Sequence, residues 1–225
     1  MKISPAKPCF SEDDIKAITD RIGTILSNGW LTSGPAVQEF EKEFAEYLGV
    51  KHVIATNNGT SALACVLKAL GVKGTTVLVP DCTFAATAHA VLWTGGSVRL
   101  VDIEDPATFN VGVATVEREF KEARSRNEVV STVMVVHIGG HSVDMDPIRD
   151  FCRDHNLFLV EDAAHAHGAE YKGRKCGTLS DAACFSFYPT KLLTTGEGGA
   201  IATNNDELAE RCRSITNQGR RTLYT

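Results

Sequence analysis

The chain has 225 residues, 43% of them hydrophobic and 23% charged, a composition typical of a globular protein with one large core. Its net charge of −5, without a basic block or stripe, argues against nucleic acid and anionic membranes as partners. No apolar run approaches the roughly 20 residues of a membrane span, and the N-terminus has no apolar signal-peptide core. Its seven scattered cysteines include no CxxC pair, which favours a cytoplasmic protein with no disulfides and no metal site.

Short β-branched runs alternate with helical stretches along most of the chain. Seven runs are expected to form strands: 52–56, 75–80, 97–103, 131–138, 157–163, 182–188 and 198–204. Residues 11–27 and 36–48 have the pattern of amphipathic helices, and further helical patterns separate the early strands. Because the strands are continuously apolar, we expect an α/β fold with a seven-stranded, mostly parallel sheet and helices on both faces. A short loop joins the last two strands, so the last strand is expected to be antiparallel.

Lys191 lies between two of these apolar runs, in the segment FSFYPTKLLTTGEGGAIATN (185–204). A lysine that is partly removed from water has a lowered pKa, because burial disfavours the charged form. Its neutral amine is then accessible near pH 7, which a Schiff-base lysine requires. The alternative is an exposed loop lysine without a chemical role, so the interpretation depends on its neighbours.

Three more side chains follow the ends of expected strands, where α/β sheets hold ligands. Asp162 ends the run LFLVED, and it either caps the next helix or pairs with a buried cation such as the pyridinium nitrogen of pyridoxal 5'-phosphate. His165 follows one helical turn later, as a structural histidine or as a second group at the same site. Phe84 is either a core residue or a stacking face for a planar cofactor ring.

The segment NNGTSAL (57–63) follows the first strand and opens a helix. Gly59 allows a close backbone approach, and the amides of Thr60 and Ser61 are expected at the positive end of the helix dipole. This pattern is either an ordinary helix cap or a phosphate-binding cup. Ser186, five residues before Lys191, is placed to add a hydroxyl to the same phosphate.

Four long segments carry these motifs in order. They are GWLTSGPAVQEFEKEFAEYLGVKHVIATNNGTSAL, PDCTFAATAHAVLWTGG, VEDAAHAHGAEYKGRKCGTLSDAACFSFYPTKLLTTGEGGAIATNN and ITNQGR. Together they resemble the DegT/DnrJ/EryC1/StrS family of pyridoxal-phosphate-dependent sugar aminotransferases, and the resemblance covers essentially the whole chain. It implies the large domain of a fold type I aminotransferase.

The resemblance also implies a role for each candidate residue. Lys191 forms the Schiff base with the cofactor, Asp162 pairs with the pyridine nitrogen, His165 lies near the ring hydroxyl and Phe84 stacks on the ring. The implied phosphate-binding residues are Gly59, Thr60, Ser61 and Ser186. Asn217, in TNQG, matches a family asparagine that reaches the phosphate bound by the partner subunit, which implies a homodimer. The chain departs from the family pattern at Gln218, where the usual residue is histidine.

The implied reaction moves an amino group from an amino acid donor, expected to be glutamate, to a nucleotide-linked keto-sugar, as in amino sugar and polysaccharide biosynthesis. The family's dehydratase branch has histidine in place of the lysine, so Lys191 favours transamination. Two alternatives remain open: another fold type I enzyme, such as a sugar dehydratase or a lyase, and a truncated, non-catalytic protein that binds the cofactor or regulates.

The resemblance implies two segments of unequal size. Residues 1–205 are expected to form the cofactor-binding large domain, with residues 1–48 as its N-terminal helical segment. Residues 206–225 are expected to begin the connection to a small C-terminal domain that family members have and this chain lacks.

Overall fold

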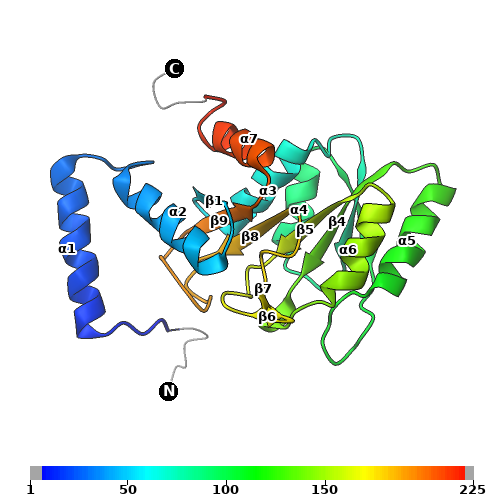
Figure 1. Cartoon of the computed structure of the whole chain (residues 1–225), viewed down its shortest axis with the longest axis horizontal. Coiled ribbons are helices and arrows are strands. Elements are labelled where there is room, and N and C mark those ends of the chain that lie inside the picture. The colour runs from blue at the N-terminus through cyan, green and yellow to red at the C-terminus, as the bar shows by residue number, and fades with distance from the viewer. Residues whose placement is uncertain (1–6, 221–225) are drawn as a thin grey trace.

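The computed structural model describes residues 7–220, and its centre is a seven-stranded sheet (Figure 1). The strands are β1 His52–Thr56, β2 Thr76–Pro80, β3 Ser97–Val101, β4 Val130–Val136, β5 Phe158–Asp162, β8 Ala182–Ser186 and β9 Gly199–Thr203. Their order in the sheet is β1-β9-β8-β5-β4-β2-β3. Strand β9 is antiparallel to both of its neighbours, and the other adjacent pairs are parallel. The expected strands and the antiparallel last strand are therefore confirmed.

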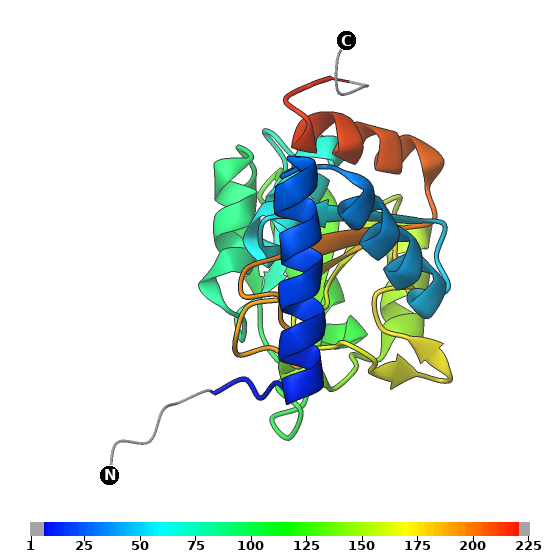
Figure 2. The ribbon, with the colours of Figure 1, turned by 90° about the vertical axis from the view of Figure 1, so that its left-hand side faces the viewer.

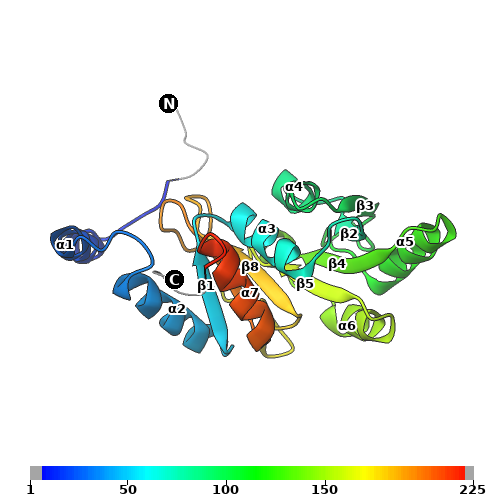
Figure 3. The same cartoon turned by 90° about the horizontal axis from the view of Figure 1, so that it is seen from above.

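Helices cover both faces of this sheet (Figure 3). One face packs against α3 Gly59–Leu70, α4 Ala85–Trp93 and α7 Asp206–Thr216, and the other against α2 Pro35–Leu48, α5 Val113–Ser125 and α6 Met145–Asp154. Successive side chains of a strand point to opposite faces, so Leu159 and Val160 of β5 belong to two different cores. Since both faces are covered, most strand residues are apolar on both faces rather than on alternate positions.

Helix α1, Glu12–Asn28, stands apart from the sheet (Figure 1), and it lies in front of the rest of the molecule in the side view of Figure 2. Ser11 caps its first turn in a capping box with Asp14, and Gly29 ends it with a φ of 67°. None of its residues is buried. Helices α1 and α2 match the two expected amphipathic helices to within one residue at each end.

Three short elements were not predicted from the sequence. Strands β6 Glu170–Tyr171 and β7 Arg174–Lys175 form an antiparallel hairpin. Lys172 and Gly173 at its tip both have positive φ, as a two-residue hairpin turn of type I′ requires. A 3₁₀ turn, η1 Ile138–Gly140, follows β4.

At the C-terminal end, α7 packs against α3 and β1, burying Leu208, Ala209 and Cys212. Residues 1–6 and 221–225, which are the ends of the two expected domain segments, lie outside the described residues. No helix formed by the described residues is both long enough and apolar enough to cross a membrane.

Candidate active site

A pocket of about 570 Å³ lies at the carboxyl ends of β4, β5 and β8, beside the N-terminus of α3. Seven of the nine residues predicted from the sequence line it: Gly59, Thr60, Phe84, Asp162, His165, Ser186 and Lys191. The topology explains this convergence, because adjacent parallel strands bring their carboxyl ends to the same edge of the sheet.

Lys191 belongs to the loop between β8 and β9. A hydrogen bond of 2.8 Å from the Phe187 amide to the Gly198 carbonyl closes this loop at its base, and the Lys191 amide donates to the Tyr188 carbonyl at 2.9 Å. Burial lowers the pKa of the Lys191 ammonium group, while the nearby charge of Asp162 acts in the opposite direction. The lowered pKa increases the fraction of neutral amine, which is the nucleophilic form.

Asp162 presents a carboxylate to the pocket from the end of β5, and its residue is 5% exposed. Its Oδ2 accepts a hydrogen bond of 2.8 Å from Thr87 Oγ1, and its Oδ1 accepts one of 3.2 Å from the Ala164 amide. Thr87 is fully buried on α4 and also lies 2.7 Å from Thr83 Oγ1. A carboxylate has about four acceptor positions, so two neutral donors leave capacity for a cation in the pocket.

His165 lies on the loop after β5. Its Nδ1 accepts a hydrogen bond of 3.3 Å from the Gly139 amide in η1, so the proton of the neutral ring is on Nε2. Burial and the nearby charge of Lys191 lower the pKa of His165, against the effect of Asp162. The turn lies close to this loop: a Cβ at Gly140, whose φ is 84°, would be 2.9 Å from the His165 carbonyl oxygen.

The N-terminus of α3 and the end of β8 meet at one side of the pocket. A Cβ at Gly59 would lie 2.8 Å from the Cβ of Ser186, so the two elements approach this closely only because residue 59 is glycine. The helix N-terminus carries partial positive charge, and the hydroxyls of Thr60 and Ser186 line the same pocket. Backbone amides, a helix dipole and hydroxyls are together suited to a phosphate.

Two predicted residues do not line this pocket. The Ser61 amide donates to Asn58 Oδ1 at 2.8 Å as part of the helix cap, and Ser61 lines a separate pocket of about 770 Å³. Asn217 is the C-terminal cap of α7. Its role toward a partner subunit, like the phosphate role of Ser61, stays a prediction.

The sequence analysis missed several residues of the site. Thr87 contacts Asp162 from α4, three residues after Phe84, and only the packing of α4 on the sheet identifies that contact. Tyr188 and Glu197 line the pocket from the two ends of the Lys191 loop. Within residues 7–220, no group of three His, Cys, Asp or Glu side chains is arranged to hold a metal ion.

The α/β fold, with a partly buried lysine, a buried carboxylate and a helix N-terminus at one edge of its sheet, has the architecture of fold type I aminotransferases. The chain belongs to the DegT/DnrJ/EryC1/StrS aminotransferase family, whose model matches residues 12–224.

Individual relatives agree with this assignment. GDP-perosamine synthase of Caulobacter vibrioides is 45% identical over 220 residues, which are 97% of this chain and 56% of that protein. The crystal structure of a family aminotransferase from Brucella abortus matches with a TM-score of 0.88 and 35% identity, covering 94% of this chain and 57% of that one. NtdA from Bacillus subtilis, solved with bound cofactor PMP, matches with a TM-score of 0.83 and 34% identity, covering 92% and 46%. The chain thus spans about half the length of the relatives it matches.

Proposed function

We propose that this chain is the cofactor-binding part of a pyridoxal-phosphate-dependent aminotransferase that moves an amino group from glutamate to a nucleotide-linked keto-sugar. The observation that carries the proposal is that Lys191, with its lowered pKa, shares one pocket with Asp162 and the Gly59–Ser186 anion site. The name of the Caulobacter relative, GDP-perosamine synthase, supports a nucleotide-linked sugar as the acceptor.

The pocket offers groups suited to the phosphate, the ring nitrogen, the aldehyde and the ring face of pyridoxal 5'-phosphate. The N-terminus of α3, kept free of a side chain at Gly59, suits the phosphate. The buried carboxylate of Asp162 suits the protonated ring nitrogen, and the amine of Lys191 suits the aldehyde. Phe84, whose side chain is 75% exposed at the pocket, offers an aromatic face to the ring.

When bound, the cofactor supplies an electron sink for bond breaking at the α-carbon of the amino donor. The residues of the chain perform the other tasks. Lys191 Nζ, in its neutral form, would take the proton from the donor α-carbon and, as general acid, deliver it to the cofactor carbon that carried the aldehyde. Asp162 keeps a positive charge on the ring nitrogen, and the hydroxyl of Thr87 holds that carboxylate in place. Ser186 and the α3 N-terminus anchor the phosphate, so the reacting atoms stay near Lys191.

The same proposal covers the assembly and the cellular location. Phe84, Leu192 and Leu193 are exposed apolar side chains at or beside the pocket, and we propose that a second subunit of a homodimer covers them. All seven cysteines are free, and five are buried, in keeping with a reducing cytoplasm. We also propose that residues after 205 begin the connection to a smaller domain, as the greater length of the relatives suggests.

Absorbance spectroscopy tests this function in three steps. The chain mixed with pyridoxal phosphate is expected to turn yellow. Glutamate is then expected to bleach the colour, and a nucleotide-linked keto-sugar is expected to restore it. GDP-, UDP- and dTDP-linked keto-sugars form the acceptor panel, and alanine replaces glutamate in a parallel arm. Colour that bleaches with glutamate but returns with none of the sugars would refute the acceptor. Absence of any bound colour would refute the cofactor. The variant Lys121→Ala, which changes an exposed lysine on α5, is the control and should behave like the parent.

A further inference from the structure

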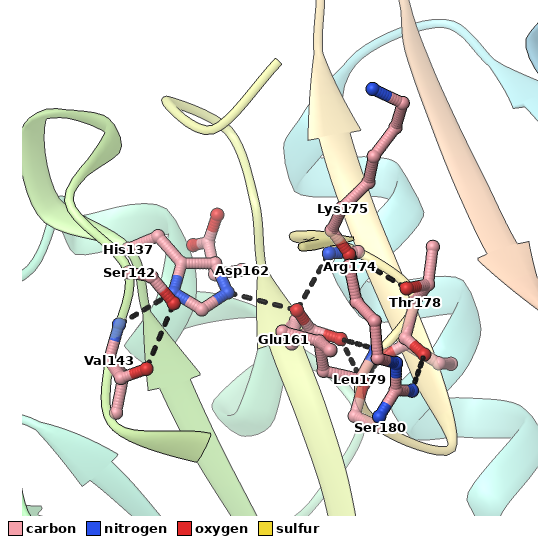
Figure 4. Close-up of polar contacts among 12 residues, drawn as sticks. His137, Ser142, Val143, Glu161, Asp162, Arg174, Lys175, Thr178, Leu179 and Ser180 are labelled. Carbon is pink, nitrogen blue, oxygen red and sulfur yellow. Dashed lines mark hydrogen bonds and ion pairs between the residues drawn. The ribbon is translucent and has the colours of Figure 1, made fainter. Parts of the chain in front are cut away.

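A second acidic residue, Glu161, immediately precedes Asp162 on β5, yet points to the other face of the sheet (Figure 4). Asp162 contacts Thr87 of α4, on the face covered by α3, α4 and α7. Glu161 contacts His137, which follows β4, on the face covered by α2, α5 and α6. Both Glu161 and His137 are fully buried. An ionisable pair is rarely buried so completely, and neither residue lines the pocket described above.

The carboxylate of Glu161 receives four hydrogen bonds. Its Oε2 accepts from His137 Nε2 at 2.9 Å and from the Gly177 amide at 2.6 Å. Its Oε1 accepts from the Leu179 amide and from Ser180 Oγ, both at 2.8 Å. Burial by itself raises the pKa of the Glu161 carboxyl, but the donors outweigh burial and hold that pKa below its ordinary value. Glu161 therefore ties the loop before β8 to the carboxyl end of β5.

His137 carries the same network to two residues of the proposed site. Its Nδ1 accepts a hydrogen bond of 3.2 Å from the Val143 amide, so Nε2 carries the proton donated to Glu161. Its own amide donates to the Asp162 carbonyl at 3.3 Å. The next residues form η1, and the Gly139 amide of that turn donates to His165 Nδ1. A shift of the His137 ring would move the backbone that supports both Asp162 and His165.

We propose that Glu161 and His137 form a positioning unit that aims Asp162 and His165 at the cofactor ring from the opposite face of the sheet. This inference rests on the proposed function, because it concerns residues that would hold pyridoxal phosphate. Neither residue touches the reacting atoms. They keep the carboxyl ends of β4 and β5 in a fixed position relative to each other. Residues that hydrogen-bond to the ligands of a metal ion orient those ligands in a similar way.

The variant Glu161→Gln tests the unit with almost no change in shape. A side-chain amide accepts through only one of its two heavy atoms, so its NH₂ group would face two donors that now meet a carboxylate oxygen. In the chain without cofactor, the amides of Gly177 and Leu179 should lose protection in hydrogen exchange. With cofactor bound, the rate of bleaching by glutamate should fall about tenfold, while the half-saturating glutamate concentration stays nearly constant. The pH midpoint of the bound cofactor's absorbance should move by about one unit, because the carboxylate of Asp162 would shift relative to the ring.

A milder variant keeps the test open if Glu161→Gln fails to fold. His137→Phe retains an aromatic ring and leaves three of the four hydrogen bonds to Glu161, although it also removes the acceptor of the Val143 amide. It should change the rate and the pH midpoint in the same direction by a smaller factor. His137→Gln, which restores an N–H donor, should recover part of the rate and part of the shift in the pH midpoint.

Thr203→Val is the matched control. Thr203 is 3% exposed, and its hydroxyl donates to the Asp181 carbonyl at the amino end of β8, away from the pocket. This variant should lose stability but keep the rate and the pH midpoint of the parent. If Glu161→Gln and His137→Phe behave like Thr203→Val, the pair only stabilises the fold and the inference is wrong. A parent chain that binds no pyridoxal phosphate would instead refute the proposed function and the inference with it.

Discussion

Replacing Thr87 by valine should lower the free energy of unfolding by more than the removal of a buried hydroxyl that has only neutral partners. Valine has nearly the same shape, so no cavity forms and the effect comes from the hydrogen bonds of the lost hydroxyl, to Asp162 and to Thr83. The bond to Asp162, 2.8 Å long, joins a fully buried hydroxyl to a carboxylate. Hydrogen bonds to charged groups contribute about 1.5–3 kcal/mol. For a chain of this size, a loss of about 2 kcal/mol corresponds to a fall in Tm of about 4–8 °C.

Thr132→Val provides the comparison. Thr132 is also fully buried, but its hydroxyl lies 3.2 Å from the neutral hydroxyl of Ser131. Urea unfolding followed by circular dichroism gives the free energy of unfolding of both variants and of the parent. We expect Thr87→Val to lose at least about 1 kcal/mol more than Thr132→Val, since a carboxylate is the stronger acceptor. Equal losses would show that Thr87 does not hold Asp162 in the way described.

Three further predictions follow from the same geometry. Asp162→Asn should keep the fold, because an amide oxygen still accepts the hydrogen bond from Thr87. It should lose most of the bleaching reaction with glutamate, and near-parental bleaching would remove Asp162 from its proposed role. Gly59→Ala should weaken cofactor binding, measured by titrating absorbance, because the new Cβ would lie 2.8 Å from that of Ser186; unchanged affinity would count against the anion site. Burial lowers the pKa of His167 to about 4, so the unfolded chain binds a proton first, and stability that is complete above pH 6.5 should fall as the pH drops toward 4. In His167→Phe, the free energy of unfolding should fall by about 3 kcal/mol less than in the parent over this pH range. Identical pH profiles of the two proteins would show that His167 is not the group responsible.

Much of the fold could be predicted from the sequence because its signals are local. Each strand is a short, continuous apolar run, and the polar residue that ends such a run, such as Asp162, must lie at the ligand-binding edge of a parallel sheet. Lys191 was identified in the same way, from its position between two buried strands. The lowered pKa of Lys191 follows from partial burial of its own side chain, which strengthens that interpretation.

The remaining features depend on contacts between distant parts of the chain. Strand β9 lies between β1 and β8, an order that no local pattern encodes. Thr87 meets Asp162 only after α4 has packed on the sheet. The hydrogen bond between His137 and Glu161 joins the end of β4 to β5 across 24 positions of sequence. Each residue by itself looks like any polar residue beside an apolar run. Pairing between strands, rather than composition, creates these contacts.

The central claim is that Lys191 is the residue that takes the cofactor covalently. The direct measurement is reduction with borohydride after incubation with pyridoxal phosphate, followed by digestion and mass spectrometry of the labelled peptide. The parent and Lys121→Ala should both carry the reduced cofactor on the peptide that contains Lys191, and Lys191→Ala should carry none. The same amount of label on Lys191→Ala, or label of the parent on a different lysine, would contradict the account of this site.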